Sequence, residues 1–113
     1  MNFDEYQGLS RRTQSEEMTD NDKLYHALFG MCSEVGEIHS IFQHFYQGEG
    51  MNGARKAALD SEAGDLLWFL SEFCDALGFK LDEVATANIN KLRRRYPYGF
   101  DVERSAHRHE IEK

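Results

Sequence analysis

Proline, the residue that most reliably interrupts a helix, occurs once in this 113-residue chain, at Pro97. Upstream of it, apolar residues recur at alternating spacings of four and three, the period of a helix that buries one face. In the segment from about residue 23 to 47 they are Leu24, Leu28, Met31, Val35, Ile38, Phe42 and Phe45. In the segment from about residue 54 to 77 they are Leu59, Ala63, Leu66, Leu70, Phe73 and Leu77. The chain is therefore predicted to form long, paired helices.

Two shorter helices are predicted at about residues 3–13 and 81–95, and the second of these ends before Pro97. Gly78 is placed to cap the helix that precedes it. Short links between long helices favour antiparallel neighbours, and no strand-like alternation is present. We expect one all-α domain over residues 1–113, an antiparallel bundle of about four helices, with a polar tail at 98–113 whose structure the pattern does not define.

The composition excludes several classes of function. A net charge of −7 argues against a nucleic-acid binder, which usually carries a basic face. The sequence contains no apolar run of 18 residues, so no membrane span is predicted. The first residues lack the features of a signal peptide. The cysteines, Cys32 and Cys74, lie in apolar helical patterns without a CxxC motif and are interpreted as small core residues in a reducing compartment. A cytoplasmic location is expected.

One six-residue pattern occurs twice, at residues 33–38 and 61–66. Each copy reads serine, glutamate, a small apolar residue, glycine, an acid and an aliphatic residue. The two acids of each copy are three residues apart, so they project from one helix face. If the two helices pack antiparallel, four carboxylates meet: Glu34, Glu37, Glu62 and Asp65.

Bringing four carboxylates together is unfavourable unless cations neutralise them. A glycine inside a helix costs about 1 kcal/mol relative to alanine. Gly36 and Gly64 therefore suggest that a helix or a ligand approaches closely there, although they could merely ease helix packing. Two further acid pairs with the same spacing lack the glycine and the rest of the pattern; they are Glu17 with Asp20 and Glu72 with Asp75.

Oxygen ligands without histidine or thiolate suit a hard cation, Mg²⁺ or alternatively Mn²⁺. A di-iron bundle would need Glu-x-x-His on two helices, and the chain has Ser40 three residues after Glu37. Such ions can polarise a phosphoryl group and supply a nucleophilic water. The four acids are therefore predicted to be both metal ligands and the catalytic carboxylates.

The helix at residues 81–95 offers groups for phosphates. Asn88 and Lys91 are three residues apart on it, and Arg95 and Tyr96 stand at its end. The alternative is that basic residues there only complement the helix dipole. Trp68, three residues after Asp65, is a candidate to stack on a base, although packing is the favoured interpretation.

Together these segments resemble the all-α nucleoside triphosphate pyrophosphohydrolases of the MazG-like type. The likeness rests on the two acid motifs, on residues 65–70, on residues 88–97 and on residues 99–105. It implies Mg²⁺-dependent hydrolysis of a ribo- or deoxyribonucleoside triphosphate between the α- and β-phosphates, giving a monophosphate and pyrophosphate. It also implies that the four acids bind metal, that one of them orients or deprotonates the attacking water, and that Asn88 and Lys91 hold phosphates. A homodimer or homotetramer is expected from the resemblance.

The alternative is a non-enzymatic interaction module whose acidic helices bind a basic partner. On that hypothesis single acids are dispensable and Mg²⁺ does not raise the melting temperature.

Overall fold

The computed structural model describes residues 1–48 and 50–108. Its helices are α1 (Phe3–Arg11), α2 (Asp20–Gln43), the 3₁₀ turn η1 (His44–Gln47), α3 (Gly53–Leu77), α4 (Leu81–Arg95) and α5 (Val102–Ala106). The described ranges contain no extended strand, so the predicted all-α class is confirmed. None of these helices is long and apolar enough to cross a membrane.

Local capping sets the helix ends. α2 begins three residues earlier than predicted because the Thr19 side chain accepts a hydrogen bond from the Asp22 amide, while the Asp22 carboxylate accepts one from the Thr19 amide. Its last turn tightens into η1, which ends at Gly48 with φ of 84°. α3 ends as predicted at Gly78, whose φ of 74° is the left-handed conformation that glycine adopts most readily.

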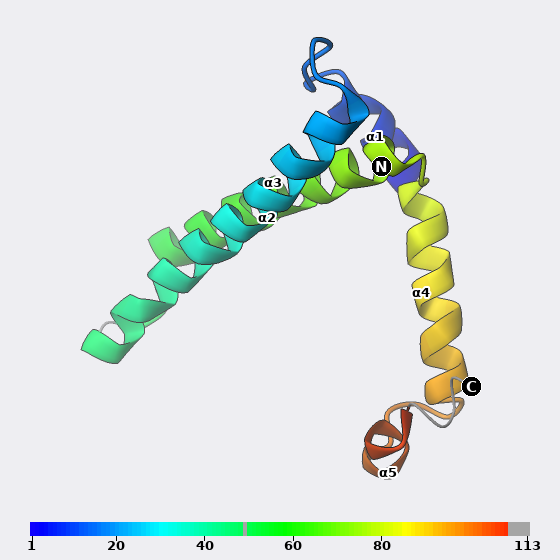
Figure 1. Ribbon diagram of the computed structural model, residues 1–113. Helices are drawn as coiled ribbons and strands as arrows, with labels where there is room; N and C mark the ends of the chain where they lie inside the picture. Colours follow the sequence, from blue (N-terminus) through cyan, green and yellow to red (C-terminus); the bar gives the residue numbers. More distant parts are fainter. Residues whose placement is uncertain (49, 109–113) are drawn as a thin grey trace.

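α2 and α3 run antiparallel and side by side over most of their length (Figure 1). α1 lies across the end of this hairpin where α2 begins and α3 finishes. Its Ser10 hydroxyl is 2.8 Å from the Ser71 hydroxyl, and both side chains are buried. The hairpin therefore positions the two acid motifs, and α1 covers only one end of it.

Gln7 joins α1 to both α3 and α4. Its side-chain amide nitrogen donates to Asp75 Oδ1 at 2.8 Å and to the Phe79 carbonyl at 2.9 Å. Its amide oxygen accepts from the Leu81 amide at the start of α4. From this junction α4 extends away from the hairpin (Figure 1). The radius of gyration is 17.6 Å, against about 13 Å for a compact domain of this length.

The hairpin contact does not follow the whole predicted apolar seam of α2. Leu28, Val35 and Phe42 are 48%, 53% and 41% exposed. The face of α2 that meets α3 instead carries Ala27, Gly30 and Glu34. Both cysteines are free thiols. Cys74 is buried, but the prediction of a core position was wrong for Cys32, which lies on the exposed side of α2.

Candidate metal centre

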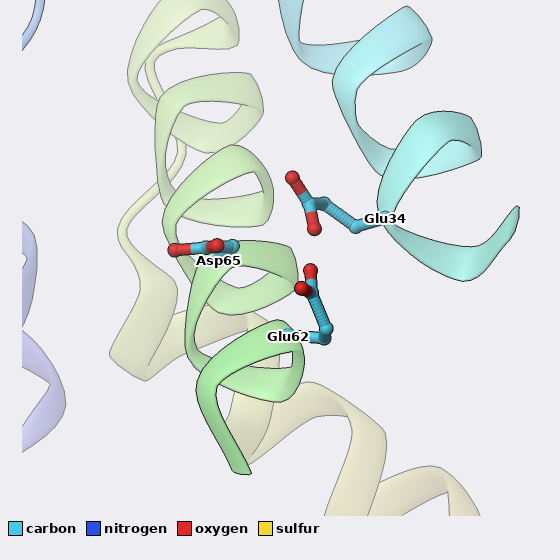
Figure 2. A group of neighbouring side chains, drawn as sticks. All are labelled: Glu34, Glu62 and Asp65. Atoms are coloured by element: carbon cyan, nitrogen blue, oxygen red, sulfur yellow. The ribbon is translucent and has the colours of Figure 1, made fainter. Parts of the chain in front are cut away.

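Three of the predicted carboxylates meet at the middle of the hairpin (Figure 2). Glu34 projects from α2, and Glu62 and Asp65 project from consecutive turns of α3. One ligand oxygen from each lies within 4.8 Å of the others. Glu34 and Glu62 are half-buried, whereas Asp65 is exposed. The i, i+3 spacing and the antiparallel packing thus bring together three of the four carboxylates that were expected to meet.

Glu37 borders this group from one turn further along α2. Its pKa is raised, first by contact with the Glu62 carboxyl and then by Coulomb repulsion from it. The pKa of Glu62 is raised in turn, chiefly by the Glu34 carboxyl. Both shifts express the cost of gathering like charges. All four predicted acids therefore interact electrostatically.

Two oxygens of the cluster lack a partner. Oε2 of Glu34 and Oε2 of Glu62 are shielded from solvent, and no donor in the described ranges reaches either atom. A buried carboxylate oxygen without a donor is costly unless a proton or a cation satisfies it. The donor set here is oxygen alone, which is what Mg²⁺ and Mn²⁺ prefer. The residues present therefore fit a hard divalent cation.

His26 forms a pair with a carboxylate outside the cluster. His26 Nδ1 lies 2.7 Å from Glu72 Oε1, and the Glu72 side chain is 1% exposed. This pair lies two turns of α2 before Glu34. Sequence reasoning treated Glu72 and Asp75 only as an acid pair without the full pattern, and missed that each has a partner of its own.

Asp75 receives hydrogen bonds from three side chains. Gln7 and Arg11 donate to Oδ1 at 2.8 Å each, and Gln14 donates to Oδ2 at 2.7 Å. Burial alone would raise the pKa of Asp75, but the hydrogen bonds from Arg11, Gln14 and Gln7 outweigh it and hold the pKa below its ordinary value. Asp75 is therefore a satisfied structural carboxylate.

The glycines of the doubled motif do not mediate close contacts within the chain. A Cβ placed on Gly36 or Gly64 would meet nothing within 4 Å. Gly30, which sequence reasoning overlooked, is the helical glycine with a close neighbour, because a Cβ there would overlap the Phe69 ring. The available signal was its position, one turn before Glu34.

The Trp68 side chain joins α3 to the turn after α1. Its indole nitrogen donates to Thr13 Oγ1 at 2.8 Å, and its ring meets those of His26 and Phe69 edge-on at 6.3 and 5.2 Å. These contacts agree with the packing interpretation. Stacking of Trp68 on a base stays a prediction.

The predicted phosphate-binding residues belong to α4 and its end, which diverge from the hairpin (Figure 1). Asn88 is exposed and Lys91 is half-buried. The Arg95 carbonyl accepts from Arg104 Nε, and the Tyr96 ring lies 5.3 Å from that of Phe100. Within one chain these groups are not brought to the carboxylates, so their role stays a prediction.

A comparison with protein-family models gives a match over most of the chain. Residues 23–100 match the family model of the MazG nucleotide pyrophosphohydrolase domain, a span that includes all four carboxylates and α4. Searches of curated proteins and of solved structures found no significant match.

Proposed function

The chain belongs to the MazG nucleotide pyrophosphohydrolase domain family, and from this we propose that it hydrolyses a ribo- or deoxyribonucleoside triphosphate between the α- and β-phosphates, with Mg²⁺. The products are a nucleoside monophosphate and pyrophosphate. The observation that carries the proposal is the carboxylate cluster with two buried, unpartnered oxygens. We also propose that it acts in the cytoplasm.

Glu34, Glu62 and Asp65 are the residues that would hold the metal, with Glu37 beside them. A bound Mg²⁺ would supply charge neutralisation of the phosphates and polarisation of the scissile anhydride. Mn²⁺ would serve the same set of oxygens.

The chain's own part in the reaction is to place a base beside the attacking water. We assign this role to Glu37, because it is exposed at the edge of the cluster, one turn beyond Glu34 on α2. The Glu37 carboxylate accepts a proton from the water while the water oxygen forms a bond to phosphorus. The anhydride bond then breaks, and the pyrophosphate leaves with its electron pair.

Asn88, Lys91, Arg95 and Tyr96 are proposed to bind the phosphates in an assembly of two or four copies. α4 departs from its own hairpin, and α2 exposes an apolar stripe that would be covered by a second copy. The stripe comprises Tyr25, Leu28, Phe29, Val35 and Phe42. Charge favours the same arrangement, since the basic end of α4 complements an acidic cluster.

The first experiment is a panel of canonical and modified nucleoside triphosphates with Mg²⁺ or Mn²⁺, with pyrophosphate release as the readout. Turnover of at least one nucleotide is expected, and Glu37→Gln should abolish it. No turnover on the whole panel would contradict the enzymatic proposal. Full activity and metal affinity in Glu37→Gln would contradict the site.

Subunit complementation tests the assembly. Glu62→Gln and Lys91→Ala are each expected to be inactive alone. If Lys91 acts in a neighbour's site, mixing the two variants after dissociation and reassociation restores activity, because one mixed site contains neither substitution. No recovery in mixtures shown to form hetero-oligomers would contradict a shared site.

The alternative, an acidic interaction module, predicts a different response to metal. The proposed enzyme gains thermal stability with Mg²⁺, because the cation binds only the folded chain. An interaction module would gain no thermal stability with Mg²⁺.

A further inference from the structure

The face of α3 that meets α2 carries an aromatic residue, Phe69, next to the acids. Glu62, Asp65, Phe69 and Glu72 follow one another at spacings of three, four and three, which places them on one side of the helix. Phe69 therefore separates the carboxylate cluster from the pair that Glu72 forms with His26.

Phe69 packs directly onto the backbone of α2. Opposite it stands Gly30, and an ideal Cβ built there would fall among the carbon atoms of the Phe69 ring. Any residue with a side chain at position 30 would thus push the ring, or the whole helix, away. The contact is possible only with glycine at that position.

The ring has little freedom to give way. The ring of His26 lies 5.5 Å from it on one side, and that of Trp68 lies 5.2 Å from it on another. Trp68 is itself held by its hydrogen bond to Thr13. A Phe69 ring displaced from Gly30 would meet these two rings, so we expect part of the displacement to move α2 away from α3.

This contact lies one helical turn from the acids on both helices. Gly30 precedes Glu34 by four residues, and Phe69 follows Asp65 by four residues. The distance between α2 and α3 at this contact consequently sets how far Glu34 stands from the two acids of α3.

We propose that Phe69 seated on Gly30 is the spacer that fixes the separation of Glu34 from Glu62 and Asp65, and so selects Mg²⁺ over a larger divalent cation. Gly30 and Phe69 are positioning residues that touch neither metal nor substrate. The inference rests on the proposed function, since it concerns the same carboxylates.

Cation size provides the readout. Mg²⁺ binds oxygen at about 2.0–2.1 Å in near-ideal octahedral geometry, whereas Ca²⁺ accepts about 2.3–2.6 Å and irregular geometry. Widening the hairpin at the acids should weaken Mg²⁺ binding more than Ca²⁺ binding. A general loss of stability would lower both affinities alike and leave their ratio unchanged.

The test is Gly30→Ala in the full chain, with calorimetric titration of Mg²⁺ and Ca²⁺ and a circular-dichroism check that the helices persist. We expect Mg²⁺ affinity to fall about 10-fold or more, as when outer partners of metal ligands are changed. The ratio of Ca²⁺ to Mg²⁺ affinity should rise. The matched control is Gly53→Ala, the same change in the same hairpin at an open position nine residues before Glu62, for which both affinities should be unchanged.

A second background keeps the test decisive if Gly30→Ala folds poorly. Phe69→Leu removes the ring and leaves room opposite Gly30, and the added methyl of Gly30→Ala then fills that space. The same substitution should thus weaken Mg²⁺ binding beside Phe69 and strengthen it in the Phe69→Leu background. This reversal of sign is a double-mutant coupling that independent sites do not give.

Two results would overturn the inference. One is Gly30→Ala with unaltered Mg²⁺ affinity and Ca²⁺ preference; the other is equal Mg²⁺ affinity in Phe69→Leu with and without Gly30→Ala. Either would leave the metal centre itself intact if the wild-type chain binds Mg²⁺. If the wild-type chain binds no divalent cation, the proposed function and the spacer fail together.

Discussion

α3 carries two groups of acids in very different surroundings. Asp75, near its end, receives donors from Gln7, Arg11 and Gln14, whereas Glu62 and Asp65, near its middle, face other carboxylates. The difference follows from what faces each group: α1 and the turn after it supply donors to Asp75, whereas the groups that α2 places opposite Glu62 are carboxylates. The same residue type is thus structural where α1 supplies donors and available for a cation where it does not.

Replacing Glu62 should have the largest effect. Glu62→Gln removes a ligand, so we expect Mg²⁺ affinity and turnover to fall at least ~100-fold, since outer partners of ligands alone contribute roughly 10–100-fold. The metal-free protein should be as stable as wild type or more so, because a repulsive charge is lost. Calorimetry and urea unfolding measure the two quantities. Unaltered Mg²⁺ affinity would remove Glu62 from the site.

Replacing Asp75 should give the opposite result. Asp75→Ala leaves one N–H of the Gln7 amide and one N–H of the Gln14 amide without an acceptor, at a cost of about 2–3 kcal/mol in the free energy of unfolding. Mg²⁺ affinity should be unchanged, because the site lies about 15 Å along the helix. Asp60→Ala, at an exposed position of the same helix, is the control and should cost no more than about 0.5 kcal/mol. A parallel loss of Mg²⁺ affinity would show that the two regions are coupled.

The two regions should also respond to pH in opposite directions. The pKa values of Glu37 and Glu62 are raised by folding, so the folded chain binds more protons there, and its stability rises as the pH falls from neutrality through these raised values. The lowered pKa of Asp75 stabilises the fold above the ordinary aspartate range, and this contribution is lost as the pH falls through the lowered value. Metal-free protein should therefore have its highest melting temperature on the acid side of neutrality.

Saturating Mg²⁺ should move this maximum to higher pH, because the cation replaces the proton. Melting curves across pH with EDTA or Mg²⁺ provide the measurement. The maximum should also flatten in Glu62→Gln. If neither Mg²⁺ nor Glu62→Gln changes the pH of maximum melting temperature, the cluster does not control the pH response.

The smallest effect is expected at the outward glycine of the acid motif. Gly36→Ala meets no neighbour within the chain and should stabilise α2 by up to about 1 kcal/mol. Urea unfolding at several protein concentrations checks this. A loss of stability would contradict it, and a loss that grows on dilution would place a second copy against that face.

Local rules predicted much of this structure. The end of α3 at Gly78 and the meeting of Glu34, Glu62 and Asp65 follow from capping and from the i, i+3 geometry. The role of Gly30 could not be predicted in this way, because it depends on Phe69, which lies far away in the sequence. The direction of α4 depends on the hydrogen bonds of Gln7. The exposure of Cys32 depends on which face of α2 meets α3. The spacing of hydrophobic residues reveals neither of these.

The partners of Gln7 have a consequence for the order of folding. They lie 68, 72 and 74 positions along the chain, whereas α2 and α3 are joined by a short connection. Since closing a long loop costs more entropy than closing a short one, we expect the hairpin to form first and α1 to dock last. The carboxylates would then come together before the chain is fully folded, and a divalent cation could speed refolding instead of merely stabilising its product.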